Sequence, residues 1–441
     1  MTEEVFPEQS APDEPARSGR WSRRLRGLAV DVSPLRESAA FRRLTVGDVV
    51  SLVGTQMTAV AVPVQMFEIT GSSFMVGLLG IAALVPLVVL GIVGGAIADA
   101  MDRRRLVLTT SSGAMLVSAA FFLQALLGVE APWLLYLLVA LQASCFAIES
   151  PARRAITPRL IGLDKIPAAT ALGQVTFSLG VVVGPLLGGT LISALGLRWA
   201  YGIDAATFAV ALWAAAQLPS MVPEGGGTAA GLGSVLEGLR FLRTQPIVLM
   251  TFAVDVNAMV FGMPRALFPA MAIGTFGGDE QTVGLLYAAP AAGALLGALL
   301  GGWFGRIHRQ GWAVLLAVAA WGASIVAFGL TSTLWLACLF LALAGAADMV
   351  SAIFRTAILV AATPDAMRGR LSGVHIAVVA GGPRLGDAEA GAVASLTSPQ
   401  VSVVSGGLAC IAGVVVLAAL APTFARYDSR HAPQLPDEKA G

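Results

Sequence analysis

The sequence is poor in charged residues. Only 12% of its 441 residues are Asp, Glu, Lys or Arg, whereas 56% are hydrophobic, and the mean hydropathy is +0.78. Soluble globular domains carry about 25% charged residues. This composition therefore excludes an ordinary soluble protein and predicts an integral membrane protein.

Cysteine and histidine are also scarce, with three of each. Cys145, Cys338 and Cys410 lie inside apolar runs, where thiols are typically buried and inert, so no structural disulfide is expected. The histidines form no metal-ligand spacing, and no nucleotide-binding loop or serine nucleophile motif occurs. We therefore expect no enzyme, no metal, no cofactor and no nucleic-acid partner. Residues 1–40 lack an early apolar core, so no signal peptide is expected.

Twelve apolar runs follow a polar segment of residues 1–43. Each approaches or exceeds the ~20 residues that a helix needs to cross a bilayer core. The expected spans are residues 45–67, 74–98, 106–127, 132–149, 168–194, 199–218, 247–272, 282–304, 312–331, 334–354, 371–396 and 400–421. The sequence thus predicts an all-α membrane protein with twelve transmembrane helices.

Basic residues are distributed unevenly among the loops. The two tails and the loops that follow even-numbered spans hold 24 of the 28 Lys and Arg residues, and the opposite loops hold only Arg198. The positive-inside rule then places both termini in the cytoplasm. Only two of the 28 are lysines, which is typical of a GC-rich bacterial genome, so a bacterial inner-membrane location is expected.

The two halves of the chain repeat. Val76-Gly77-Leu78-Leu79 returns 207 residues later as Val283-Gly284-Leu285-Leu286, and Gly184-Pro185 returns 198 residues later as Gly382-Pro383. A six-span unit used twice in one orientation is a parallel repeat, known from transporters. The expected parts are a cytoplasmic tail (1–43), two six-helix bundles (44–218 and 247–421), a linker (219–246) with an amphipathic helix at 234–243, and a second cytoplasmic tail (422–441).

A short charged stretch joins the second and third spans, as a tight cytoplasmic loop would. Gly94-Gly95 leads to Asp99 and then to Asp102-Arg103-Arg104-Arg105. The stretch resembles the loop between helices 2 and 3 of the major facilitator superfamily, Gly-x-x-x-Asp followed by a basic cluster, although Met101-Asp102 stands where that family usually has a glycine. The resemblance implies a cytoplasmic gate formed by Gly95, Asp99, Arg103, Arg104 and Glu149.

In that gate, Glu149 at the end of span 4 would pair with the loop arginines. Asp99 would face the N-terminus of span 11 and its positive dipole end. The alternative is that these charges are only topology signals.

Span 5 contains Gly180-x-x-x-Gly184-Pro185-x-x-Gly188-Gly189. The proline removes one backbone hydrogen bond, and the glycines leave a flat, bendable face. The stretch is similar to the antiporter motif of the superfamily, which implies export. Gly-x-x-x-Gly spacing recurs in spans 2, 8 and 11. These spans and span 5 are the second helix of each three-helix unit, and the resemblance implies that this set forms the moving interface between the halves. Ordinary helix packing is the alternative.

Ionisable residues occur inside the expected spans, namely Asp255, Arg265, Asp348, Arg384 and Asp387. A charge at mid-bilayer costs at least ~2.5–3.5 kcal/mol, so such residues usually face a cavity and pair. We expect Asp255 and Asp348 to lie beside Arg384, with Asp255 as the proton-carrying acid. A purely structural ion-pair cluster is the alternative. Any proton-linked charge is expected in the C-terminal half.

Further stretches, among them Pro151-Ala152-Arg153-Arg154 and Thr363-Pro364-Asp365-Ala366, resemble the enterobactin-exporter and macrolide-efflux branch of the superfamily. The resemblance implies a secondary exporter that works by alternating access with proton antiport. Its cargo would be a small amphipathic molecule such as a siderophore. A multidrug or macrolide efflux pump and a non-transporting membrane sensor are the alternatives. The expected partners are a small molecule, protons and the lipid bilayer, and the chain is expected to be a monomer.

Overall fold

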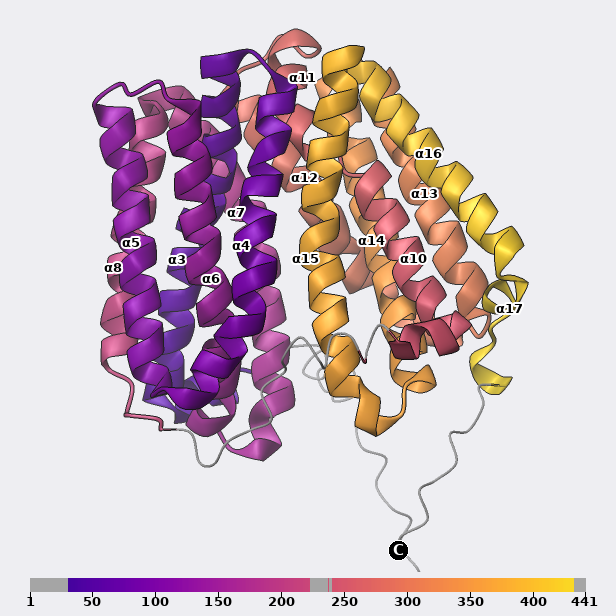
Figure 1. Cartoon of the computed structure of the whole chain (residues 1–441), viewed down its shortest axis with the longest axis horizontal. Helices are drawn as coiled ribbons and strands as arrows, with labels where there is room; N and C mark the ends of the chain where they lie inside the picture. Colours follow the sequence, from indigo (N-terminus) through magenta and orange to yellow (C-terminus); the bar gives the residue numbers. More distant parts are fainter. Residues whose placement is uncertain (1–30, 223–236, 238–239, 432–441) are drawn as a thin grey trace, which may run out of the picture.

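The computed structural model describes residues 31–222, 237 and 240–431. In these residues every assigned element is an α-helix or a 3-10 helix, and no strand occurs. Twelve long helices of the described chain stand side by side in two groups (Figure 1). The predicted all-α class is therefore confirmed.

The first group of helices, at the left of Figure 1, we call the N-terminal half. It consists of α2 (Ser33–Glu37), α3 (Ala39–Thr70), α4 (Ser73–Ala100), α5 (Arg103–Leu126), α6 (Pro132–Leu160), the 3-10 turn η1 (Leu163–Lys165), α7 (Ile166–Leu195) and α8 (Leu197–Ala216). Ser38 and Ser72 begin α3 and α4 by accepting a backbone N–H of the first turn. Gly71 ends α3 with φ of 61°, a left-handed conformation that suits glycine.

The second group we call the C-terminal half. It consists of α10 (Pro246–Phe261), η2 (Arg265–Leu267), α11 (Phe268–Gly274), α12 (Glu280–Leu300), η3 (Gly301–Arg306), α13 (Gln310–Leu330), α14 (Leu334–Ala362), α15 (Asp365–Leu396), α16 (Pro399–Leu420), α17 (Pro422–Ala425) and η4 (Ser429–His431). Half of the predicted amphipathic helix at 234–243 lies outside the described residues, and the described half, residues 237 and 240–243, is helical. Residues 1–30 of the N-terminal tail and 432–441 of the C-terminal tail also lie outside the described residues.

Eleven stretches of the described chain are long and apolar enough to cross a membrane. The twelfth long helix, α15, stands beside them but carries Arg384, Asp387 and Glu389. Several helices run past the predicted ends of their spans. For example, α6 continues beyond Glu149 to Leu160, because polar residues can continue a helix beyond its apolar run.

The predicted span 247–272 is two helices rather than one. The chain leaves helical geometry between Phe261 and Phe268. Pro264 has no backbone N–H, and Gly262 has weak helix propensity, so the helix is easily broken here. The side chain of Trp321 stabilises the break, because its Nε1 donates to the Gly262 carbonyl at 2.9 Å.

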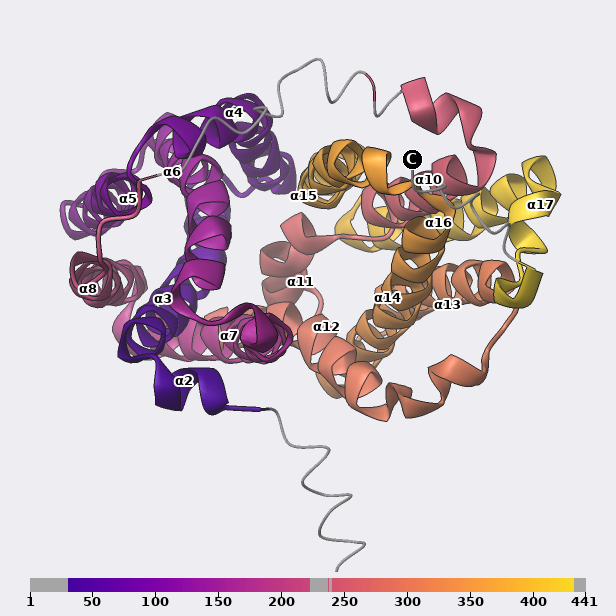
Figure 2. The ribbon, with the colours of Figure 1, turned by 90° about the horizontal axis from the view of Figure 1, so that it is seen from below.

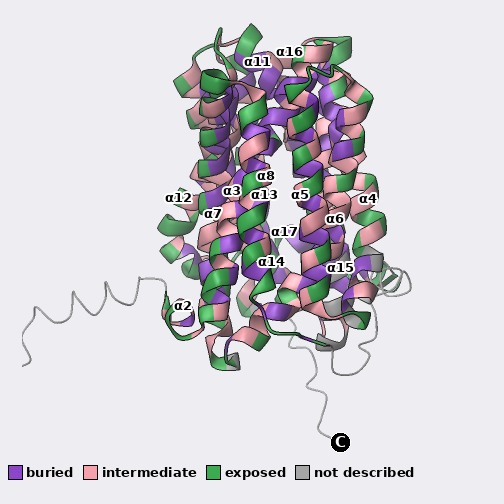
Figure 3. Cartoon of the chain, turned by 90° about the vertical axis from the view of Figure 1, so that its left-hand side faces the viewer, coloured by how far each residue is buried: buried purple, intermediate pink, exposed green. Residues whose placement is uncertain are grey.

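The two halves meet chiefly through two pairs of helices, α4 with α15 and α7 with α12 (Figure 2), and α3 also contacts α11 and α12. The two pairs consist of the second and fifth long helices of each half, in keeping with the sequence repeat. We call the end of the molecule that holds α11 the upper end, and the end that holds α2 and α17 the lower end (Figures 1 and 3).

Large apolar side chains are exposed on many helices, including Leu116, Trp133, Phe146 and Leu420. Figure 3 shows exposed positions along the outward faces of the helices. Such a surface suits lipid, in which the backbone must be hydrogen-bonded within each helix. The protein is a multi-pass membrane protein.

Candidate functional site

The contact between α4 and α15 lies in the upper part of both helices. A Cβ built on Gly80 would lie 2.7 Å from the carbonyl oxygen of Arg384, and one built on Gly391 would lie 2.6 Å from that of Ser73. Ordinary contacts of a Cβ begin near 3.4 Å. The two backbones therefore approach too closely at these points for any side chain to fit between them.

The contact between α7 and α12 is equally close and also lies in the upper part. A Cβ on Gly189 would be 2.6 Å from the carbonyl oxygen of Glu280 and 2.9 Å from the Cα of Gly284. A Cβ on Gly284 would be 2.5 Å from the carbonyl oxygen of Pro185. Each pair of helices thus joins the halves through backbone surfaces.

The glycines at the lower ends of the same helices make no such approach. Among the described residues, no atom outside the local chain lies within 4 Å of a Cβ built on Gly91, Gly95 or Gly173. These glycines lie in the lower parts of α4 and α7. The close backbone contacts between the halves at these glycines therefore lie at the upper end.

The regularly spaced glycine rows have a different role from the one expected. Gly180, Gly184 and Gly188 pack α7 against Leu52, Gln56 and Met57 of α3, inside the N-terminal half. Likewise, Gly293 packs on Ala342 of α14, and Gly382 and Gly386 pack on Met259 of α10, inside the C-terminal half. Of the predicted antiporter motif, Pro185 and Gly189 reach the other half, where both lie against Gly284. The helices that carry these rows do meet between the halves, as expected. The rows in α7, α12 and α15 nevertheless pack within their own half, because sequence spacing does not fix which neighbour a helix face meets.

One polar contact closes the upper end. Ser193 Oγ, on α7, donates to Asp279 Oδ2 at 2.6 Å. Asp279 also caps α12, since its Oδ1 accepts the backbone N–H of Thr282 at 3.3 Å. The hydrogen bond from Ser193 holds the pKa of Asp279 below its ordinary value. We call the Ser193–Asp279 pair the upper latch.

A charge cluster lies inside the C-terminal half. Arg355 Nη1 is 2.6 Å from Asp255 Oδ1, and Arg355 Nη2 is 3.6 Å from Asp348 Oδ1. The Asp255 side chain is only 4% exposed, whereas that of Asp348 is 35% exposed. One guanidinium therefore lies between two carboxylates, of which one is buried and one is partly exposed.

We expected Arg384 to be the partner of Asp255 and Asp348, but Arg355 takes that position. Arg384 hydrogen-bonds the carbonyl of Ala380 on its own helix instead. The sequence predicts a span that stops at residue 354, but α14 continues to Ala362 and so includes Arg355. The spacing of seven residues from Asp348 to Arg355, two helical turns, could have placed both on one face.

The break between α10 and α11 holds a second group of charges. Asp387 Oδ1 accepts the backbone N–H of Ala266 at 3.1 Å, and the Tyr287 hydroxyl donates to the carbonyl of Arg265 at 3.2 Å. Asp387 lies within electrostatic range of Arg265 and Arg384. The structure therefore divides the predicted membrane charges into two groups. Arg265, Arg384 and Asp387 lie near one another, whereas Asp255 and Asp348 pair with Arg355.

At the lower end of the N-terminal half, Glu149 is buried and has three partners. Its carboxylate oxygens accept hydrogen bonds from Thr110 Oγ1 and Ser111 Oγ, each at 3.0 Å. Arg153, one turn further along α6, forms ion pairs with both Glu149 and Asp48 of α3. The predicted pairing of Glu149 with the loop arginines is therefore corrected in this conformation, because Arg153 takes that place.

The loop arginines bind backbone carbonyls of their own half. Arg103 Nη1 donates to Ala155 O at 3.2 Å, and Arg104 Nη2 donates to Ala216 O at 2.6 Å. Asp99 lies in α4, but its side chain is outside the described part of the structure.

The N-terminal half contains a buried carboxyl that sequence reasoning missed. Asp204 of α8 is 0% exposed, and its Oδ2 accepts hydrogen bonds from Ser118 Oγ at 2.7 Å and Thr58 Oγ1 at 2.9 Å. Its position inside the sixth predicted span was the available signal. The expectation that membrane charges with a link to protons occur only in the C-terminal half no longer follows.

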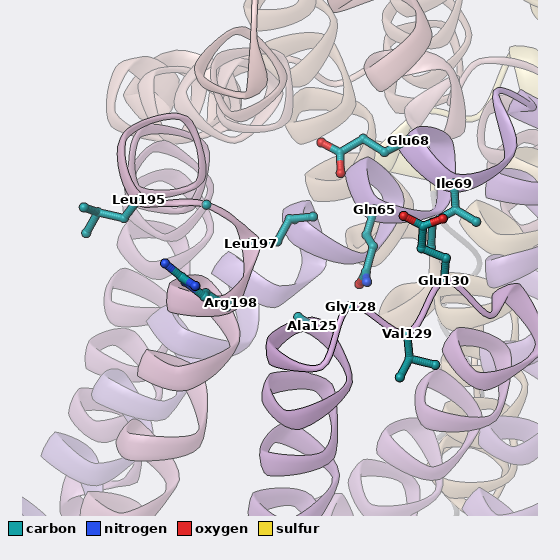
Figure 4. Close-up of a pocket in the computed structure, with 11 residues that line it drawn as sticks. Gln65, Glu68, Ile69, Ala125, Gly128, Val129, Glu130, Leu195, Leu197 and Arg198 are labelled. Carbon is teal, nitrogen blue, oxygen red and sulfur yellow. The ribbon is translucent and has the colours of Figure 1, made fainter.

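A pocket of about 350 Å³ opens at the upper end of the N-terminal half (Figure 4). Its polar lining comes from Gln65, Glu68, Glu130 and Arg198, and no predicted site residue contributes. Elsewhere in the described residues, no three His, Cys, Asp or Glu side chains come together as a metal site would require.

Comparison with known proteins decides the family. Residues 29–438 match the transmembrane secretion effector family. The chain belongs to this family, within the major facilitator superfamily. The enterobactin exporter EntS of Citrobacter koseri is 30% identical over 412 residues, which cover 92% of this chain and 97% of that one.

Solved transporters share the fold of this secretion effector. A bacterial homologue of the human lysosomal transporter Spinster, in an inward-facing and unoccupied conformation, superposes with a TM-score of 0.68 at 17% identity, covering 91% of this chain and 98% of that one. A variant of the nucleoside transporter NupG gives 0.71 at 13% identity, covering 87% and 99%. These structures share the fold, and the family match with the exporter relative identifies the chain as a membrane transporter rather than an enzyme.

Proposed function

We propose that the protein exports a small amphipathic molecule of the siderophore type across a bacterial inner membrane by alternating access. The observation that carries this proposal is that glycine contacts join the halves at the upper end, whereas Gly91, Gly95 and Gly173 at the lower end of the same helices have no neighbour. Backbone contacts of this kind, without interlocking side chains, can separate while each half keeps its own packing. The proposed moving bodies are residues 44–218 and 247–421, joined by 219–246, and the unit is a monomer.

The lower end is proposed to face the cytoplasm. It carries the loops and tails that hold 24 of the 28 basic residues, which the positive-inside rule assigns to that side. Both termini are then cytoplasmic, and the proposed state of the described conformation is open to the cytoplasm. This is the state in which an exporter takes up its cargo.

The cargo class rests on the relatives. An enterobactin exporter is 30% identical over 92% of this chain, so a catechol-bearing, anionic siderophore is the first candidate. Arg265 and Arg384 supply positive charge near the break in the seventh span, where an anionic group can bind. Multidrug or macrolide efflux, and ligand binding without flux, are the other outcomes to be tested.

The proposed coupling site is the cluster Asp255–Arg355–Asp348. One guanidinium cannot neutralise two carboxylates, so a proton on either acid completes the charge balance. Asp348 is exposed enough to exchange protons, and Asp255 is buried behind Arg355. During proton antiport the cluster would alternate between two states. In one state both acids are ionised and share Arg355, and in the other state one acid is protonated and Arg355 pairs with the other.

The proposed lower gate consists of Gly95, Asp99, Arg103, Arg104 and Glu149. When the lower end closes, α4 must approach α15, which brings Asp99 toward the start of that helix and its positive dipole end. A changed partner for Glu149 is part of this proposal.

The test is siderophore export from an efflux-deficient host that synthesises a catecholate siderophore. We expect cells with the protein to release more siderophore and retain less than cells without it. The same assay is run on Asp255→Asn, the variant of the proposed coupling site. Its matched control is Asp164→Asn, the same substitution at an exposed residue of a loop. Equal internal and external amounts with and without the protein would reject the siderophore as cargo, and drug efflux in the same host would reassign it.

A further inference from the structure

The carboxyl of Asp204 is the buried acid that the proposed coupling site does not use. It comes from α8, and its two hydroxyl donors come from α3 (Thr58) and α5 (Ser118). Both donors bind Oδ2, and Oδ1 has no hydrogen-bond partner among the described residues. The three helices thus meet around a single carboxyl.

No described cation pairs with this carboxyl. The charged residues of the helices that pack on α8 are Arg42, Arg43, Asp48 and Glu68 on α3 and Arg103, Arg104 and Arg105 on α5, whereas α7 has none. Asp48 and Glu68 each lie ten residues from Thr58, or about 15 Å along the helix, and Arg105 is about 20 Å from Ser118.

On α8 itself, Arg198 is six residues from Asp204, about 9 Å along the axis, and lines the upper pocket. The Tyr201 hydroxyl, the nearest titratable group on that helix, donates to Gln65 Oε1 at 2.7 Å. Asp204 is thus surrounded by neutral groups.

The packing leaves no space for a metal ion or a water beside Oδ1. Asp204 Oδ1 is buried and has almost no surface that a water-sized sphere can reach. On the side of α3, a Cβ built on Gly54 would collide with Thr207 Oγ1 and lie 2.8 Å from Asp204 Oδ1. A buried water needs room of its own and several polar partners. The counter-ion that this packing admits is a proton.

An ionised carboxylate in this place would lose its hydration and gain only two hydroxyl hydrogen bonds. The penalty for burying an unpaired charge exceeds that gain, which is why such charges are normally paired or neutralised. We propose that Asp204 is a proton-binding site of the N-terminal half, occupied in the described conformation. Its proton resides on Oδ1, and the neutral carboxyl joins α3, α5 and α8.

The site is separate from the Asp255–Arg355–Asp348 cluster, which lies in the other half. It does not depend on the proposed cargo or on the proposed coupling site. The consequence is that loss of the proton leaves a bare carboxylate between three helices and loosens the N-terminal half. Proton occupancy here therefore controls how firmly α3 is held to α8.

Infrared difference spectroscopy of the full-length protein in lipid nanodiscs tests the proposal directly, without cargo or transport. The wild-type spectrum minus the Asp204→Asn spectrum at neutral pH is expected to contain the carbonyl band of a protonated carboxyl that shifts in heavy water. The matched control is Asp48→Asn on α3, an aspartate paired with Arg153, whose difference spectrum is expected to contain carboxylate bands instead. A carboxylate band for Asp204 would overturn the proposal, and so would a band that responds to sodium at constant pH.

Thermal unfolding across a pH series gives a second measurement. The contribution of a carboxyl that is protonated when folded is lost as pH rises, because the unfolded chain releases that proton more readily. The melting temperature of the wild type is expected to fall with rising pH more steeply than that of Asp204→Asn. Parallel curves for the two proteins would contradict the proposal. If Asp204→Asn does not fold, Ser118→Ala supplies the test, because it removes one hydroxyl donor and keeps the carboxyl whose band is followed.

Discussion

Substitution of Gly284 by alanine tests whether the contact of α7 with α12 holds the upper end closed. The new Cβ would lie 2.5 Å from the carbonyl oxygen of Pro185 and 3.0 Å from the Cα of Gly189, where ordinary contacts begin near 3.4 Å. Both neighbours are backbone atoms, so α12 must move away from α7 by about 1 Å to reach ordinary contact distance.

Overpacking of this kind costs about 1–3 kcal/mol. The cost falls only on the conformation in which the two helices touch. The ratio of molecules closed at the upper end to molecules open there should therefore fall by about 5- to 150-fold. The free energy of unfolding of each half should change little, because the contact lies between the halves.

The assay is the distribution of distances between spin labels on Glu130→Cys and Ser332→Cys, two exposed positions at the upper end of opposite halves. The native Cys145, Cys338 and Cys410 are replaced beforehand. Gly284→Ala is expected to increase the long-distance population.

Two controls separate the effect on the gate from an effect on stability. Gly274→Ala places its Cβ in open space and should change nothing. Gly293→Ala collides with the backbone of Ala342 inside the C-terminal half, so it should lower the melting temperature without changing the distance ratio. An unchanged distance ratio in Gly284→Ala would refute the role of this contact as a gate.

Three further predictions concern the upper latch, the coupling site and the topology. Ser193→Ala should weaken closure of the upper end at neutral pH, because it removes the hydrogen bond to Asp279. The pKa of Asp279 is lowered by that bond, so wild-type closure should weaken only as pH falls below the ordinary aspartate value of 3.8. The same pH profile of closure in the variant and the wild type would argue against the latch. Asp255→Asn should abolish accumulation of cargo driven by a pH gradient yet permit downhill exchange, and wild-type accumulation in this variant would exclude Asp255 as the coupling acid. Arg355→Ala should lower the free energy of unfolding by about 3–5 kcal/mol, because it leaves a buried carboxylate unpaired. Ser332→Cys should react with an impermeant maleimide added outside intact cells, and protection there would invert the proposed orientation.

The number of long helices and the division of the chain into two similar halves were predictable from the sequence, because long apolar runs and an internal repeat indicate them. The break in the seventh span was not predicted, although Gly262 and Pro264 were visible, because the apolar run continues through them. Arg355 was missed as a partner for a related reason. Apolar runs do not mark where helices begin and end, and α14 continues beyond its apolar run.

The roles of the glycines could not be predicted from spacing. Gly184 and Gly189 belong to one motif, yet the first faces α3 and the second faces α12. A difference of five residues turns a helix by more than one full turn, and only the packed structure fixes which face meets which neighbour. Asp204 was missed because the surrounding span is apolar, and a single acid in an apolar run does not reveal the hydroxyl groups that other helices bring to it.

Export of a catecholate siderophore by the purified protein tests the central claim most directly. The protein is reconstituted in liposomes, sealed inside-out vesicles are selected by the accessibility of Thr244→Cys at the lower end, and a pH gradient is imposed with the interior acidic. The account predicts uptake of the siderophore into these vesicles, collapse of that uptake when the gradient is dissipated, and retention of it in Asp164→Asn. Siderophore that equilibrates no faster than in empty liposomes would contradict it.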